Sequence, residues 1–126
     1  MLNQIVLVAL GGAIGSVGRQ LVNLGAARLF GPGLPLGTFT VNLVGAFAMG
    51  VFIELLARRL GGSAELRVFV ATGIIGGFTT FSSFALDTAV LWERGEAATA
   101  FAYVAGTLIL GFGALFAGLA LARHFA

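Results

Sequence analysis

The most chemically informative part of the chain is a short polar segment inside an apolar stretch. Residues 76–84 read GGFTTFSSF, so a glycine pair is followed by two threonines, two serines and three phenylalanines. Adjacent glycines and β-branched threonines are poor helix formers, which predicts a helix break here. A break frees peptide carbonyls, and freed carbonyls can coordinate a small cation. The alternative is a kinked helix whose hydroxyl groups bond back to their own backbone.

The phenylalanines suggest a second kind of chemistry. Phe81 and Phe84 lie three residues apart, so they share one face of a helix, and Thr80 and Ser83 are interleaved with them. The edge of an aromatic ring is electropositive. Ring edges beside hydroxyl donors could hold a small anion without the tight binding that a full positive charge would cause, as conduction requires. The alternative is a pair of lipid-facing side chains.

The elements that position these residues must be membrane helices. Of the 126 residues, 59% are hydrophobic and 10% are charged, whereas soluble domains carry roughly 25% charged residues. This excludes a free soluble protein. The lack of cysteine and the single histidine, His124, exclude disulfides, thiolate nucleophiles and a histidine metal cluster. The net charge of +2 indicates no nucleic-acid partner.

Four charge-free stretches are long enough to cross a bilayer, which takes about 20 apolar residues. We therefore predict an all-α, multi-pass protein of a bacterial or archaeal plasma or inner membrane. The first stretch lacks the basic start of a removable signal peptide. A single domain over residues 1–126 would hold four transmembrane helices, the third broken near its middle, at about 3–27, 36–59, 65–93 and 97–124.

Glycine is abundant, with 20 residues. Three pairs fit the small-xxx-small pattern that lets membrane helices approach closely: Gly11/Gly15, Gly73/Gly77 and Gly113/Ala117. They predict tight packing within an oligomer. The alternative is that some of these glycines have no packing role.

The arginines orient the chain only weakly. One side of the membrane would hold Arg58, Arg59, Arg67 and Arg123, and the other Arg19, Arg28 and Arg94. Four against three is a small bias under the positive-inside rule. Either one poorly specified orientation or dual topology with antiparallel pairing follows.

Polar side chains inside a membrane are functional candidates by default. Asn42 offers two donors, although an isolated asparagine more often forms a helix–helix hydrogen bond. Arg19 is expected to extend to the membrane interface, with attraction of anions at a pore mouth as the alternative. No carboxylate lies at mid-depth, and no catalytic triad or Walker loop is present, so we do not expect an enzyme.

Three segments together resemble the CrcB/Fluc family of fluoride channels. They are the glycine-rich stretch 11–19 that ends in Arg19, the stretch 37–45 around Asn42, and residues 76–84, close to the family's GG-x-TTFSTF signature. Their order, their spacing, the chain length and the four-helix layout all match. The third segment is the specific one.

The resemblance implies an antiparallel, dual-topology homodimer in the lipid bilayer, with no obligate other protein partner. It would have two fluoride pores and a structural sodium ion at the dimer centre, and would let cytoplasmic fluoride leave passively, which gives fluoride resistance. The backbone carbonyls of Gly76 and Thr79 correspond to the sodium ligands, and Arg19 to the vestibule residue. The residues corresponding to the fluoride pore are Asn42, Phe81, Phe84, Thr80, Ser82, Ser83, Tyr103 and Thr107.

The sequence departs from the family pattern at three positions. Ser83 replaces the usual threonine, Ser16 replaces an alanine, and Gly111 stands where some members carry a further hydroxyl one turn beyond Thr107.

Two other functions fit the size of the chain. A small proton-coupled, dual-topology exporter would carry an intramembrane glutamate, which helix 1 lacks. A non-transporting membrane assembly subunit would not need hydroxyls, rings and a helix break in one segment.

Overall fold

Long apolar helices make up almost the whole chain. The computed structural model describes all residues 1–126 and contains α1 (Leu2–Phe30), α2 (Leu36–Arg58) and α6 (Ala97–Phe125) as continuous helices. The third span, Ala64–Glu93, is built from four pieces: α3 (Ala64–Arg67), the π-helix η1 (Val68–Ile75), α4 (Gly76–Phe78) and α5 (Phe81–Glu93). All four spans are long and apolar enough to cross a membrane. The all-α, multi-pass prediction is therefore confirmed.

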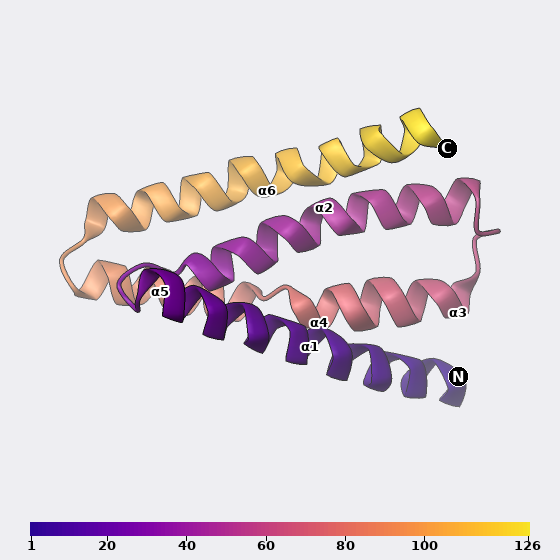
Figure 1. Cartoon of the computed structure of the whole chain (residues 1–126), viewed down its shortest axis with the longest axis horizontal. Helices are drawn as coiled ribbons and strands as arrows, with labels where there is room; N and C mark the ends of the chain where they lie inside the picture. The colour runs from indigo at the N-terminus through magenta and orange to yellow at the C-terminus, as the bar shows by residue number, and fades with distance from the viewer.

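The four spans run back and forth along one axis (Figure 1). Both termini and the α2–α3 connection lie at one end, and the α1–α2 and α5–α6 connections lie at the other. An extended thread separates α4 from α5 near the middle of the third span. The predicted break thus exists, but it falls on Thr79 and Thr80, just after the glycine pair and not within it.

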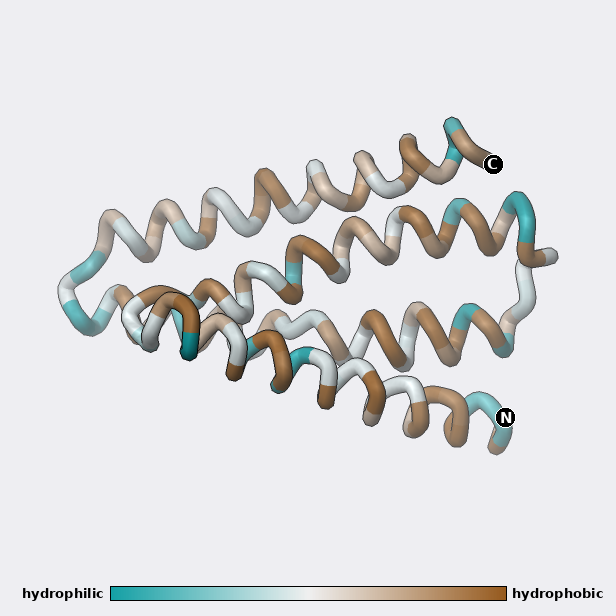
Figure 2. The backbone as a smooth tube through the Cα atoms, viewed as in Figure 1, coloured by the Kyte–Doolittle hydropathy of each residue, from teal (hydrophilic) through white to brown (hydrophobic).

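The surface of the bundle is apolar. Figure 2 shows hydrophobic residues along the lengths of the helices and most hydrophilic ones near the two ends. Large apolar side chains such as Ile109 and Phe101 are exposed, and only Val41 and Leu91 are large side chains buried almost completely. A surface of this kind suits lipid.

Glycine contacts hold α1 against the third span. A Cβ atom on Gly11 would overlap the Phe69 carbonyl, and one on Gly15 would overlap the Ile74 carbonyl. A Cβ atom on Gly77 would come within 2.8 Å of the Gly12 carbonyl. The predicted packing through the first two glycine pairs is confirmed, because these helices touch through their backbones.

The third predicted pair does not pack within the protomer. A Cβ atom on Gly113 would meet nothing within 4 Å. The close contact between α2 and α6 is made instead by Gly50, against the Leu115 carbonyl, and Gly118, against the Phe47 carbonyl. The small-residue spacing alone did not reveal which face of α6 is turned toward α2.

Polar contacts fasten the two ends of the bundle. Ser63 caps α3 by accepting a hydrogen bond from the Leu66 amide at 3.2 Å. The Glu54 carboxylate on α2 pairs with Arg58 at 2.5 Å and with Arg123 of α6 at 3.2 Å. At the opposite end, Arg94 donates to the Gly33 carbonyl at 2.9 Å and ties two loops together.

Candidate functional site

The break in the third span is a pair of extended residues between two helices. Thr79 has φ −84° and ψ 159°, and Thr80 has φ −153° and ψ 116°. Both amide and hydroxyl groups of Thr79 donate to the Ile75 carbonyl, at 3.0 and 3.1 Å. The Thr80 hydroxyl caps α5 by accepting a hydrogen bond from the Ser83 amide at 3.1 Å. The two threonines therefore end one helix and start the next.

Asn42 of α2 binds the main chain at the break. Its Oδ1 accepts a hydrogen bond from the Thr80 amide at 2.8 Å, and its Nδ2 donates to the Thr80 carbonyl at 3.1 Å. An isolated asparagine was expected to favour a helix–helix hydrogen bond. The observed contact does join two spans, but it does so through two bonds to a single non-helical residue.

Arg19 of α1 binds the other side of the break. Its Nε donates to the Gly77 carbonyl at 3.1 Å, and the residue is half-buried. The expectation that Arg19 extends freely to the membrane interface does not match this contact. The guanidinium group places a positive charge beside the negative C-terminal end of the helix that stops at Phe78.

The carbonyls of Gly76, Gly77, Phe78 and Thr79 accept no backbone hydrogen bond across the break, and that of Gly77 accepts one from Arg19 instead. They lie at the C-terminal end of a helix, where the macrodipole favours a positive charge. Carbonyl oxygens are hard ligands of the kind that Na⁺ accepts. No group of three or more histidine, cysteine or acidic residues could hold a metal, and the carbonyl oxygens at the break are candidate ligands for a cation.

The two phenylalanines that follow the break lie in different surroundings. Phe84 is buried and meets Tyr103 of α6 edge to face, with ring centroids 5.2 Å apart. Phe81 is exposed on the protomer. The predicted aromatic pair is therefore present as neighbouring rings, but only one of them packs within the chain.

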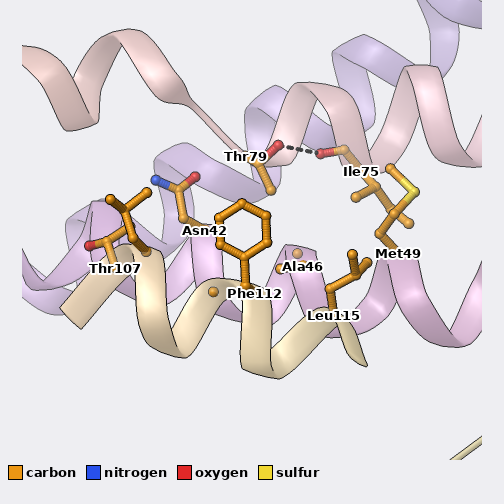
Figure 3. A pocket seen from close by; sticks show the side chains of 11 residues that line it. Asn42, Ala46, Met49, Ile75, Thr79, Thr107, Phe112 and Leu115 are labelled. Atoms are coloured by element: carbon orange, nitrogen blue, oxygen red, sulfur yellow. Dashed lines mark hydrogen bonds between the residues drawn. The ribbon is translucent and has the colours of Figure 1, made fainter. Parts of the chain in front are cut away.

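An open cavity of about 260 Å³ brings several predicted residues together. It is lined by Asn42, Thr79, Thr80, Phe81, Phe84, Thr107, Leu108 and Gly111. An adjoining cavity of about 320 Å³ shares Asn42, Thr79 and Thr107 and continues between α2, η1 and α6. Figure 3 shows Asn42 and Thr107 at one end of the larger cavity, and Met49, Ile75 and Leu115 at the other.

Thr107 has the one buried side-chain polar atom without a hydrogen-bond partner, its Oγ1. A buried hydroxyl without a hydrogen-bond partner is energetically costly, so its presence in a native structure calls for an explanation such as a functional role. Thr107 lies in the wall shared by the two cavities, although its Oγ1 itself has almost no exposed surface.

The remaining predicted hydroxyls lie elsewhere. Ser83 lines a separate, polar cavity of about 290 Å³ that also contains Asn23, Thr38 and Asp87. Ser82 is exposed, with its hydroxyl 3.3 Å from that of Thr80. The Tyr103 hydroxyl donates to the Asp87 carboxylate at 3.3 Å. One protomer therefore does not place all the predicted hydroxyls along one surface.

Sequence reasoning missed three contributors to this site. The π-helix before the break follows from no residue pattern considered, although π-helical turns often occur at functional sites. Gly45 was quoted as part of a motif, yet its role is spatial, because a Cβ atom there would overlap the Thr79 methyl group. Asp87 was not considered as a site residue, whereas it lines the polar cavity.

Comparison with known proteins gives consistent matches over nearly the whole chain. The family described as CrcB-like protein, camphor resistance, matches residues 6–119. A fluoride-specific ion channel of Mesorhizobium japonicum is 59% identical over 119 residues, which cover 94% of this chain and 95% of that protein. Proteins with the same name from Agrobacterium fabrum and Paracoccus denitrificans are 53% and 56% identical, over 95% and 92% of this chain and 96% and 91% of their own lengths.

Proposed function

The chain belongs to the CrcB-like family, and we propose that it is a fluoride-specific channel that lets fluoride cross a cell membrane passively. An ion channel binds and releases its ion without covalent chemistry, so the chain is not an enzyme. The polar residues inside the spans then serve permeation. Efflux of cytoplasmic fluoride would lower its toxicity to the cell.

One observation carries the proposal beyond the family name. The extended pair Thr79–Thr80 adjoins a mostly apolar cavity, lined by threonines, an asparagine and two aromatic rings, inside the apolar bundle. Asn42, Thr107 and the rings of Phe81 and Phe84 line this cavity, and no charged residue does. Neutral donors and ring edges suit a small anion that must also be released quickly.

A sodium ion at the break is part of the proposal. The carbonyls of Gly76 and Thr79 would hold it, since they have no backbone partners and lie at a negative helix end. A bound cation supplies a positive charge that attracts an anion nearby. Arg19 adds a positive charge at the same helix end, where it donates a hydrogen bond to the Gly77 carbonyl.

The working unit is proposed to be an antiparallel pair of copies. Phe81 projects from the protomer although it neighbours the cavity, and the two carbonyls alone give a cation an incomplete shell. A second copy would cover the ring and could complete the shell with the same carbonyls. The arginines are nearly balanced between the two ends, which permits insertion in both directions.

Anion entry is proposed to begin at the polar cavity. Asn23, Thr38 and Ser83 line it together with the start of α2, whose N-terminal end favours negative charge. Asp87 also lines this cavity, and its carboxylate accepts a hydrogen bond from the Tyr103 hydroxyl at 3.3 Å. From there, fluoride would pass the rings of Phe81 and Phe84 to Thr107.

The test is efflux from liposomes that hold the purified protein, read with a fluoride electrode, with chloride run in parallel. Rapid fluoride release with little chloride release is expected. No release from a folded dimer would contradict the channel and favour a membrane assembly subunit. Release that depends on a proton gradient would favour an exporter.

A further inference from the structure

The Asn42 amide and the Thr80 peptide form a closed pair. The Thr80 amide donates to Oδ1 at 2.8 Å, and Nδ2 donates to the Thr80 carbonyl at 3.1 Å. A side-chain amide offers the same donor and acceptor as a peptide group, so this pair replaces the bonds that a neighbouring strand would supply. Because both bonds go to the main chain, Asn42 recognises the extended backbone of Thr80 and not its side chain.

These two groups of Thr80 have lost their helical partners. In an uninterrupted helix, the Thr80 amide would bond to the Gly76 carbonyl, and its carbonyl would accept from the Phe84 amide. The extended dihedral angles of Thr79 and Thr80 turn both groups out of the helix. Peptide groups without a helical partner are tolerated at membrane depth only where they are buried in protein or line a cavity, and here another span supplies partners for both groups of Thr80.

Gly45 allows this approach. It follows Asn42 by three residues on α2, so both lie on the same face. A Cβ atom on Gly45 would overlap the methyl group of Thr79. Thr79 is itself fixed by its hydroxyl bond to the Ile75 carbonyl at 3.1 Å. Gly45 therefore brings α2 against the break, and the Asn42 amide closes the contact.

We propose that Asn42 is a positioning residue, which acts on the permeating ion by holding the break in its extended form. Its Oδ1 and one Nδ2 hydrogen are engaged by Thr80, and the two bonds together fix the plane of the amide. The dihedral angles that it holds direct the Thr79 carbonyl, leave the Gly76 carbonyl without its helical donor, and set where α5, with Phe81, begins. This inference rests on the proposed function.

Two variants and a control test the inference. Asn42→Ser removes both bonds to Thr80, and Gly45→Ala leaves every polar group unchanged but pushes α2 away from Thr79. Asn3→Ser, at an exposed position near the chain start, is the matched control. Fluoride efflux from liposomes and hydrogen–deuterium exchange of the peptide that contains Thr80 are measured on each dimer.

Both variants are expected to lower fluoride efflux and to speed exchange of the Thr80 amide by roughly tenfold or more, since a protected peptide group is exposed. The control should change neither. Loss of efflux in Asn42→Ser with unchanged exchange would overturn the inference, because Asn42 would then act on the ion directly. Fast exchange with normal efflux in Gly45→Ala would also overturn it.

The design separates this inference from the proposed function. A wild-type dimer that releases no fluoride would contradict the channel, while the exchange measurement would still decide whether Asn42 holds the break. If Asn42→Ser does not fold, Gly45→Ala decides, because it keeps the Asn42 side chain intact and changes only the distance between α2 and the break.

Discussion

Phe81 and Phe84 meet edge to face, with ring centroids 5.9 Å apart and planes at 68°, yet Phe84 is 8% exposed and Phe81 is 78% exposed. They lie on adjoining positions of one helical face. The inner ring packs on Tyr103, at a centroid distance of 5.2 Å, while the outer ring projects from the protomer. Two residues of one type, three positions apart, therefore contribute differently to folding and to the site.

This asymmetry predicts different effects of substitution. Phe84→Ala should lower the free energy of unfolding by about 3 kcal/mol, because a buried ring is lost. Phe81→Ile should leave unfolding of the protomer nearly unchanged but reduce fluoride efflux by roughly tenfold, since a ring edge beside the cavity is replaced by an alkyl group. Unfolding in detergent and liposome efflux measure these effects. Equal losses of stability in both variants would contradict the prediction.

Removal of the Thr107 hydroxyl should preserve or raise stability but lower fluoride efflux. Thr107→Val removes a buried hydroxyl that has no partner, so the free energy of unfolding should stay equal or rise by about 1 kcal/mol. Fluoride efflux should nevertheless fall several-fold, because Thr107 lies in the wall shared by the two cavities and its hydroxyl has no partner within the chain. Thr88→Val is the control, since the Thr88 hydroxyl bonds to the Phe84 carbonyl at 2.9 Å. A Thr107 variant with normal efflux would remove this residue from the path.

The glycine contacts predict a position-specific effect in α1. Gly15→Ala should lower the free energy of unfolding by about 1–3 kcal/mol, because the added methyl group would overlap the Ile74 carbonyl. Gly25→Ala on the same helix meets nothing within 4 Å, and alanine should raise helix stability there by up to about 1 kcal/mol. Unfolding curves of the two variants, measured in one detergent, check the prediction. Similar changes in both would show that backbone contact is not decisive.

Because positive charges are nearly balanced between the two ends of the bundle, added arginines at one end should fix the direction in which the chain inserts into the membrane. Leu60→Arg with Glu65→Arg adds positive charge at one end of the bundle, and Leu29→Arg with Glu93→Arg adds it at the other; all four positions are exposed. Each double variant alone should insert in one direction and lose efflux, since antiparallel pairs cannot form. Co-expression of the two should restore fluoride resistance in cells. Full activity of either variant alone would contradict dual topology.

The free carbonyls at the break predict a requirement for sodium. Protein prepared throughout in potassium or in a large organic cation should form less dimer and release fluoride more slowly than protein prepared in sodium. The reason is that the carbonyls of Gly76 and Thr79 accept no backbone hydrogen bond across the break. They also lie at the negative end of a helix, where a bound cation is favoured. Dimer fraction by size-exclusion chromatography and liposome efflux are the measurements, with sodium added back as the control. Unchanged values would exclude a structural sodium ion.

Much of the architecture could be predicted from local sequence properties. Hydropathy over about 20 residues identifies a membrane span, and weak helix formers at 76–80 identify the neighbourhood of the break. The exact residues of the break could not be predicted, because Gly76 and Gly77 remain helical and the extended conformation is taken by Thr79 and Thr80. The choice depends on which peptide groups find partners on other spans.

The sequence by itself determined that this is a membrane protein with four spans, a polar break and a cluster of hydroxyl and aromatic side chains, because each of these follows from residues close together in the chain. Only the tertiary structure decided that Asn42 and Arg19 bind peptide groups of the break, and that Phe81 is exposed while Phe84 is buried. These relationships depend on how helices far apart in sequence are rotated and how closely they approach. Glycines such as Gly15 and Gly45 set that approach through contacts that no local pattern contains.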